Sequence, residues 1–154
     1  MGEPRPLLSA AFLCEKLLTE PGNVFSAIRI VDTWTRRSVQ LKAVSSGPES
    51  DVPAIDLGNT TLQMAALIAV KAGGTSGHHV ISIVIENSEG KRTPYPQEFP
   101  VDFTKNDPGE GAALSVQLLM PATSSDGRYW IDVLWDGTTL TRIPFRLVTE
   151  PALA

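Results

Sequence analysis

The chain has 154 residues, of which 42% are hydrophobic and 19% charged, which predicts one globular domain with a sizeable core and excludes a disordered chain. Its 13 basic and 17 acidic residues give a net charge of −4 without a concentrated basic stretch, which argues against a nucleic-acid-binding face. The single cysteine excludes an internal disulfide and a thiolate metal cluster, and no apolar run reaches the ~20 residues of a membrane span.

Residues 7–14, Leu-Leu-Ser-Ala-Ala-Phe-Leu-Cys, allow two interpretations. A signal-peptide core would be short here, with Arg5 as its only preceding positive side chain and Leu13 where processing needs a small residue. We therefore favour a first β-strand and expect the protein to be cytoplasmic. The inward row of this strand is predicted to be Leu8, Ala10, Phe12 and Cys14.

Alternation with a period of two continues along the chain and predicts further strands. A turn at residues 20–23 joins the first strand to a second at residues 24–31 in a hairpin. A third strand is predicted over residues 62–70. The run from Met64 to Val70 is apolar on both faces and also fits a buried helix, but its β-rich surroundings favour a strand. The next strands are expected at residues 79–86, 99–103 and 114–120, and the prolines around residues 99–103 suit a sheet edge.

The final strand pair has the clearest pattern. Residues 129–135 and 139–147 flank Asp136-Gly137, which favours a two-residue type I′ turn. Together the elements predict an all-β fold, an immunoglobulin-like two-sheet antiparallel β-sandwich of about eight strands, in one domain over residues 1–154. One core is expected, made of Phe12, Ile28, Ile30, Ile83, Phe103, Val116, Ile131, Val133 and Phe145.

The connection between Trp34 and Leu62 is long for a compact domain. Residues 37–44 could form a short edge strand with Val39, Leu41 and Ala43 inward. Residues 45–61, rich in Ser, Gly, Pro, Glu and Asp, are expected to be the most mobile part of the chain, because little apolar surface offsets the entropy cost of ordering them.

Three stretches of the chain carry a further signal: Cys14-Glu15-Lys16-Leu17 with Gly22 and Phe25 to Asp32, then Gly77-His78-His79 with Glu86 to Gly90, then Gly127-Arg128-Tyr129 with Asp136-Gly137 and Pro144 to Val148. Together they resemble a family of small bacterial immunoglobulin-like β-sandwich domains whose function is uncharacterised. The resemblance implies a sandwich fold and transfers no catalytic residue. The loop at residues 45–61 looks longer than the family's usual connection.

Candidate groups for chemistry are few. The adjacent His78 and His79 point to opposite faces if both lie in a strand, so we expect a strand entry with one solvated imidazole and no metal site. The glycine-rich residues 73–77 lack the lysine and the strand–loop–helix context of a phosphate loop, so a flexible hairpin connection is expected. Cys14 is interpreted as a small buried hydrophobic side chain.

Three carboxylates, Asp126, Asp132 and Asp136, lie near the ends of the last hairpin. Two carboxylates that lie close together can act as an acid–base pair. Asp126 and Asp136 precede glycines, where Asp favours local backbone bonding in turns, so we predict no catalytic residue, no cofactor and no enzyme activity.

Trp130 falls on the face opposite the core row, across the hairpin from Arg142. The candidate interface on this face is Trp130, Leu134, Leu140, Arg142 and Arg146, a mixture typical of interface cores. Covering of Trp130 by a loop is the alternative. The sequence thus predicts a non-enzymatic interaction or assembly module that binds another protein or its own copy, without nucleic acid or membrane. An exported carbohydrate-binding or adhesive domain is the second hypothesis.

Overall fold

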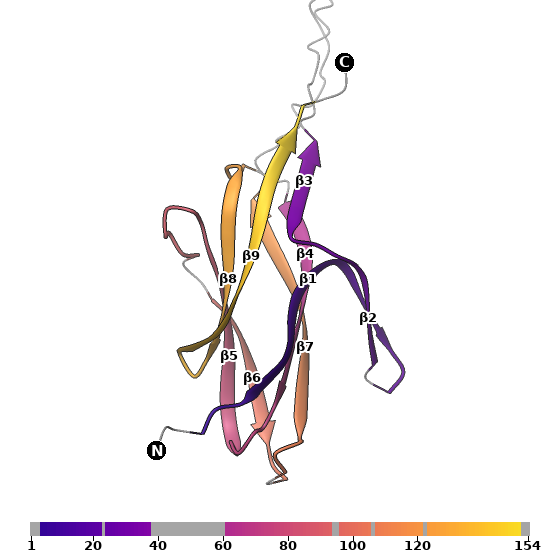
Figure 1. The fold of residues 1–154 in the computed structure, drawn as a ribbon, viewed down its shortest axis with the longest axis vertical. Coiled ribbons are helices and arrows are strands. Elements are labelled where there is room, and N and C mark those ends of the chain that lie inside the picture. Colours follow the sequence, from indigo (N-terminus) through magenta and orange to yellow (C-terminus); the bar gives the residue numbers. More distant parts are fainter. Residues whose placement is uncertain are drawn as a thin grey trace, which may run out of the picture.

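The computed structural model describes residues 4–22, 24–37, 61–93, 96–105, 107–121 and 123–151, which form nine strands in two packed sheets (Figure 1). We call the four-stranded sheet, with the order β2-β1-β4-β7, sheet A. Its strands are β2 (Val24–Ile30), β1 (Leu7–Glu20), β4 (Thr61–Lys71) and β7 (Gly111–Pro121). Sheet B has five strands in the order β3-β9-β8-β5-β6. They are β3 (Thr33–Arg37), β9 (Thr138–Glu150), β8 (Gly127–Trp135), β5 (Gly77–Glu86) and β6 (Gln97–Phe103).

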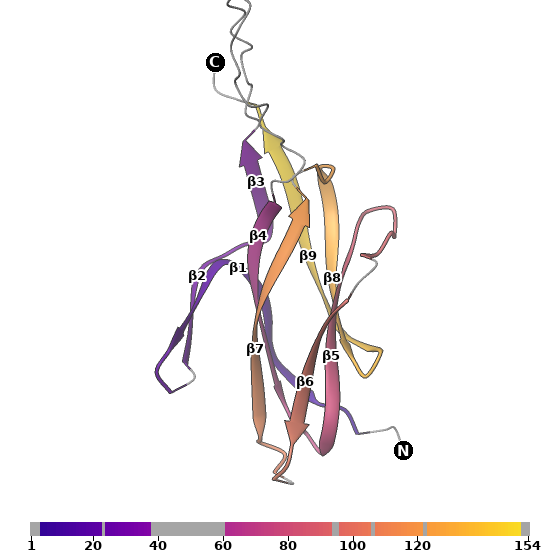
Figure 2. The ribbon, with the colours of Figure 1, turned by 180° about the vertical axis from the view of Figure 1, so that it is seen from behind.

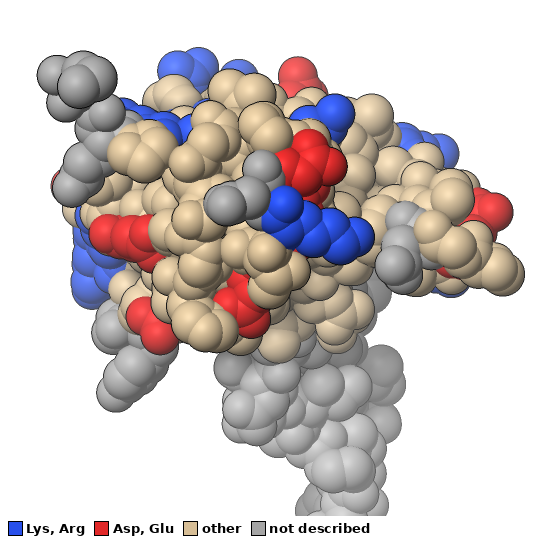
Figure 3. All heavy atoms as spheres, turned by 90° about the horizontal axis from the view of Figure 1, so that it is seen from below, with Lys and Arg blue, Asp and Glu red and all other residues tan. Residues whose placement is uncertain are grey.

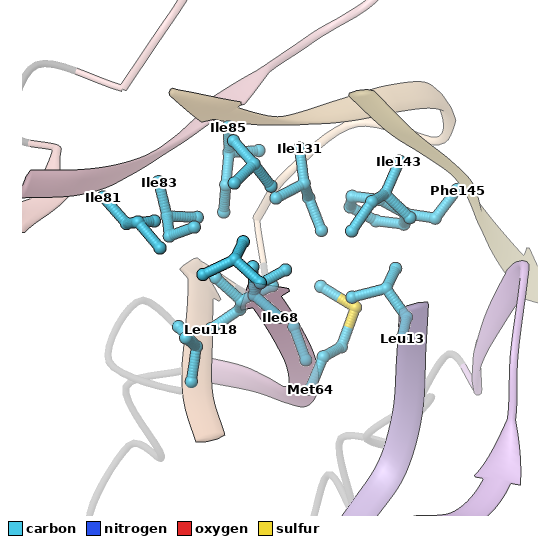
Figure 4. Close-up of a cluster of buried hydrophobic side chains, with 14 of the residues drawn as sticks. Leu13, Met64, Ile68, Ile81, Ile83, Ile85, Leu118, Ile131, Ile143 and Phe145 are labelled. Atoms are coloured by element: carbon cyan, nitrogen blue, oxygen red, sulfur yellow. The ribbon is translucent and has the colours of Figure 1, made fainter. Parts of the chain in front are cut away.

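The core lies between the sheets and consists of alternate residues of the strands, because side chains with a period of two share one face. In Figure 4, isoleucines of sheet B face Leu13, Met64, Ile68 and Leu118 of sheet A. The predicted strand over residues 62–70 is confirmed, as are the inward rows of β5, β6, β7 and β8. Of the predicted core, Ile83, Phe103, Val116, Ile131, Val133 and Phe145 are buried in this cluster.

The predicted inward row of β1 is wrong. Leu13 is in the core and Ala11 packs against it, while Leu8 is 39% exposed. Phe12 and Cys14 pair with Leu67 and Ala65 on the opposite, outer face of sheet A. Because this segment is apolar at almost every position, alternation could not distinguish the two faces. A register shift between Leu8 and Ala10 also changes the alternation within the strand.

The second core error is in β2, where Ile28 and Ile30 are 45% and 65% exposed. The predicted hairpin exists, since β1 and β2 pair antiparallel from Cys14 and Ile30 to Glu20 and Val24. However, β1 pairs with β4 only up to Cys14, so the rest of the hairpin has no third strand. In Figures 1 and 2 it projects from the side of the sandwich. Its side chains therefore have no opposing sheet to pack against.

The β8–β9 turn is the predicted type I′, with positive φ at both Asp136 (47°) and Gly137 (80°). The return strand contains one unexpected residue. The pairing of Val133 with Thr141 is followed by that of Leu134 with Thr139, so Leu140 is the extra residue of a bulge. The bulge reverses the alternation, and Leu140 packs against the core instead of joining the outer face.

The predicted sandwich of about eight strands is confirmed, with nine strands in the described residues, but one pair of strands is not antiparallel. β3 is a ninth strand, and it runs parallel to β9, with Trp34 beside Leu147. The connection at residues 73–77 is no hairpin either, because it takes the chain from β4 in sheet A to β5 in sheet B. The predicted strand at residues 37–44, apart from Arg37 at the end of β3, and the predicted mobile segment at residues 45–61, apart from Thr61 at the start of β4, lie outside the described residues.

Candidate functional site

The outer face of sheet B carries a network of four charged side chains. Asp132 on β8 is only 1% exposed. Its two carboxylate oxygens accept bonds from Arg142 Nε at 2.6 Å and Arg92 Nη2 at 3.0 Å. Glu86 on β5 binds the same two arginines at 2.8 and 2.9 Å. The pKa of Glu86 is lowered, first by the hydrogen bond from Arg92 and then by that from Arg142. These bonds link β5, β8, β9 and the loop after β5.

Trp130 lies beside this network and is half-buried. It pairs with Pro144 on β9 and Glu86 on β5, and the guanidinium carbon of Arg142 lies 4.9 Å from the centre of its ring. The predicted proximity of Trp130 and Arg142 is confirmed. Leu134 is also half-buried and Arg146 is exposed, whereas Leu140 is on the core side. One side of the Trp130 ring is thus covered by an arginine that is itself held by two carboxylates.

A pocket of about 320 Å³ lies where the β8–β9 turn meets the start of β5 and the N-terminal residues 4–6. His79 lines it, 17% exposed, with its Nδ1 2.7 Å from Asp136 Oδ2 and its Nε2 3.1 Å from the Ser76 carbonyl oxygen. Its ring centre is 4.5 Å from that of Trp135. Both ring nitrogens are therefore engaged by oxygens of the protein, which leaves neither to exchange a proton with a substrate.

The predicted strand entry with one solvated imidazole is confirmed, since the His78 side chain is 94% exposed while that of His79 is 17% exposed. The local backbone role expected for Asp136 is wrong. Its Oδ1 accepts the Val80 backbone N–H at 2.9 Å, 56 positions away in the sequence. Burial raises the pKa of Asp136, but the bonds from His79 and Val80 outweigh it and the net shift is downward. Asp136 thus fastens the final turn to β5.

Asp126 likewise joins distant strands instead of bonding locally. Its carboxylate accepts the Thr149 hydroxyl and backbone N–H, both at 2.7 Å, and Arg36 Nη2 at 3.0 Å. The Thr149 bonds, followed by the weaker effect of Arg36, hold the pKa of Asp126 below its usual value. This arrangement ties β3 and the end of β9 to the start of β8. Asp126 and Asp136, which the sequence offered as candidate acid–base groups, are thus both held in bonds between strands.

Cys14 is fully buried, as expected, although on the outer side of sheet A. Burial raises its thiol pKa, with a smaller opposing effect of a backbone bond to Lys16. A thiol with a raised pKa is a poor nucleophile at neutral pH.

The β1–β2 hairpin carries the feature that the sequence prediction missed. Leu18, Val24, Ile28 and Ile30 are 39%, 54%, 45% and 65% exposed, and their cross-strand pairing puts all four on one face of the hairpin. We call these four residues the hairpin face. Leu17 and Phe25, on the other face, are half-buried. Exposed aliphatic groups gathered on one projecting element are typical of a contact surface.

Charges of both signs are mixed over the end of the molecule seen in Figure 3. Within the described ranges, no group of three or more His, Cys, Asp and Glu side chains could hold a metal ion. The same residues contain no helix long and apolar enough to cross a bilayer.

Comparisons with known proteins give only distant likenesses. No family model matches the chain, and no curated protein matches it. Among solved structures it is similar to the Pseudomonas fluorescens alkylpurine DNA glycosylase AlkC bound to DNA containing an abasic site analogue, with a TM-score of 0.46 and 13% identity. This likeness covers 90% of this chain and 30% of AlkC. The periplasmic chaperone SfaE has a TM-score of 0.34 and 15% identity, over 80% of this chain and 56% of SfaE. The chain thus spans less than two thirds of either protein, and neither likeness assigns a function.

Proposed function

We propose that this protein is a non-enzymatic interaction module that binds a partner protein through the hairpin face. The observation that carries the proposal is the exposure of Leu18, Val24, Ile28 and Ile30 on one side of a hairpin that leaves the sandwich. This part of the hairpin has no third strand beside it, so these exposed aliphatic side chains do not contribute to the core between the sheets. A partner that covers them would gain apolar burial at about 25 cal/mol per Å².

The charges beside the hairpin face suggest the chemistry of the partner surface. Lys16 and Glu20 share this face, opposite Ile28 and Val24, and give it one charge of each sign. Glu15 and Arg29 bind each other at 3.0 Å on the other face of the hairpin. A mainly apolar partner surface with a mixed polar rim fits this arrangement, as in other protein interfaces. A cytoplasmic location remains part of the proposal, and an exported adhesive domain remains the alternative.

The face around Trp130 is a second candidate surface for the same function. Tryptophan and arginine are enriched in interface cores, and Trp130, Leu134, Arg142 and Arg146 supply both kinds of side chain beside an aliphatic group. It ranks second because Arg142 already covers the Trp130 ring and is bound to Asp132 and Glu86.

Affinity capture from the native host tests the proposal, using the full chain, the double variant Ile28→Glu/Ile30→Glu and the control Val80→Glu. Val80 is a matched control because it is also an exposed aliphatic strand residue, 37% exposed, but lies on β5. We expect a protein that wild type and Val80→Glu retain and the double variant loses, and that binds the purified chain in calorimetry. Equal retention by all three chains would refute the hairpin face as the docking surface.

A further inference from the structure

Sheet A ends on β7, and within the described part of the chain no strand pairs with its other side. The pairing of β7 with β4 ends at Lys71 and Gly111. Just beyond it, the Ala72 N–H donates to the Glu110 carbonyl oxygen at 2.8 Å, in the same register as the β4–β7 pairs. Because hydrogen bonds in an antiparallel strand alternate between its two sides, even-numbered residues of β7 bond to β4. The odd-numbered residues therefore direct their N–H and C=O groups to the open side.

One contact on the open side agrees with this alternation. Gln97 Nε2, from the first residue of β6, donates to the Gln117 carbonyl at 3.2 Å. This carbonyl therefore points away from β4. Around it, the backbone groups of Ala113, Ser115 and Leu119 point to the same side. Unpaired groups in a row along a sheet edge are a template for another extended strand.

The strands at the other three ends of the two sheets carry features that hinder strand addition. β6 contains Pro100, which lacks an N–H donor, between the charged Glu98 and Asp102. β3 has only five residues, and β2 contains Arg29 at a φ of 52°, which interrupts an extended edge. By contrast, β7 has 11 residues, Gly-Ala-Ala-Leu-Ser-Val-Gln-Leu-Leu-Met-Pro, without a charged side chain and with proline only at its end.

We propose that β7 pairs antiparallel with β7 of a second copy of this chain, joining the two A sheets into one. Two identical strands related by a two-fold axis meet antiparallel, so the edge is complementary to itself. An uncharged strand also avoids the like-charge contacts that self-pairing imposes on a charged one. This inference concerns a surface other than the hairpin face and does not depend on it.

The register that overlaps the full strand is centred on Val116. It places Ala113 opposite Leu119 and Ser115 opposite Gln117 of the second copy, so each small outer side chain faces a larger one. Leu119, which is 50% exposed in the single chain, is then partly covered. In this register the Ser115 N–H of the second copy donates to the Gln117 carbonyl oxygen. The bond from Gln97 Nε2 to this oxygen must therefore break when the dimer forms.

Sedimentation velocity over a dilution series of the full chain tests the association. Ser115→Pro removes only an outward N–H, which a sheet edge tolerates, and places a ring on the pairing side. Glu98→Pro is the matched control on β6, because residue 98 has the outward orientation of Pro100 two positions away. We expect dimers for wild type and Glu98→Pro, and monomers for Ser115→Pro with an unchanged circular-dichroism spectrum. A wild-type chain that stays monomeric, or a Ser115→Pro chain that dimerises equally, overturns the proposal.

Cross-linking tests the register and does not depend on how Ser115→Pro folds. Residues opposite each other in a hydrogen-bonded pair have Cα atoms about 5.5 Å apart, within disulfide range. Ala113→Cys mixed with Leu119→Cys should therefore form disulfide-linked dimers under mild oxidation. Either variant alone should not, because its two cysteines would lie about 20 Å apart at ~3.4 Å per residue. Cross-linking by one variant alone, or none in the mixture, contradicts this register. None of these changes touches the hairpin face, so either proposal can fail without the other.

Discussion

At the scale of single residues, the polar side chains of this sandwich act mainly as ties between strands. Asp132, Asp126 and Asp136 each bind groups far away in the sequence. Asp132 is almost fully buried yet has an arginine on each oxygen, which meets the requirement that a buried charge be paired. Polar residues that the sequence offered as possible catalytic groups are therefore explained by the fold.

Replacing Trp130 separates packing from recognition. Because the ring supports the Arg142 guanidinium, Trp130→Ala should lower the free energy of unfolding by about 1–2 kcal/mol from lost burial and cation–π attraction. Trp130→Phe should lose less, since a ring remains. Urea denaturation measures both variants. A Trp130→Ala chain with unchanged stability but lost binding would instead make this face the interface.

The three carboxylates with lowered pKa values predict how stability depends on pH. The pKa values of Glu86, Asp126 and Asp136 are lower in the folded than in the unfolded chain, so their stabilisation is complete above the unfolded values near 4 and is lost as pH falls below them. Urea midpoints should be level from about pH 7 to 5 and fall steeply below about pH 4. Asp136→Asn keeps a residue suited to positive φ and should flatten this fall. A midpoint that rises on acidification would contradict the assignment.

At the scale of elements, alternation predicted those strands that have one apolar and one polar face. β7 was placed correctly because Val116 and Leu118 alternate with Ser115 and Gln117. β1 failed because both of its faces are apolar. β2 failed for another reason, since its pattern says nothing about whether a second sheet lies opposite.

Long-range features of the elements also escaped prediction. The β3–β9 parallel pair depends on contacts between segments far apart, which local pattern does not encode. The Leu140 bulge lies within the final hairpin, but the alternation of the sequence does not mark the extra residue. The exposure of Ile28 and Ile30, on which the proposed function depends, became visible only with the fold. The Trp130–Arg142 contact could be predicted because a two-residue turn fixes the hairpin register.

The turn between the sheets allows a test of how closely elements pack. Gly73 has a φ of 59°, and a Cβ there would lie 2.8 Å from the Leu7 side chain and 3.1 Å from the Arg5 carbonyl oxygen. Gly22, with a φ of 84°, has open space around a Cβ. Gly22→Ala should therefore cost about 1 kcal/mol for its backbone conformation alone, and Gly73→Ala clearly more. Thermal unfolding of both variants measures the difference. Equal losses would show that the start of β1 does not pack on this turn.

At the scale of the whole molecule, the structure separates a closed core from two open elements. Phe145 and its neighbours lie between the sheets, while the hairpin face and the free edge of β7 lie outside them. Association through either open element leaves the core unchanged. An apolar surface that the fold does not need is then available for a partner.

Chemical denaturation of the double variant Ile28→Thr/Ile30→Thr measures whether the fold depends on these two side chains, with Phe145→Ala as the core reference. Threonine keeps the β-branched shape while removing apolar surface, so the double variant should stay within about 0.5 kcal/mol of wild type, as exposed substitutions do. Phe145→Ala, 3% exposed in the wild type, should lose roughly 3–5 kcal/mol. A loss of several kcal/mol in the double variant would place these isoleucines in the core and contradict the account.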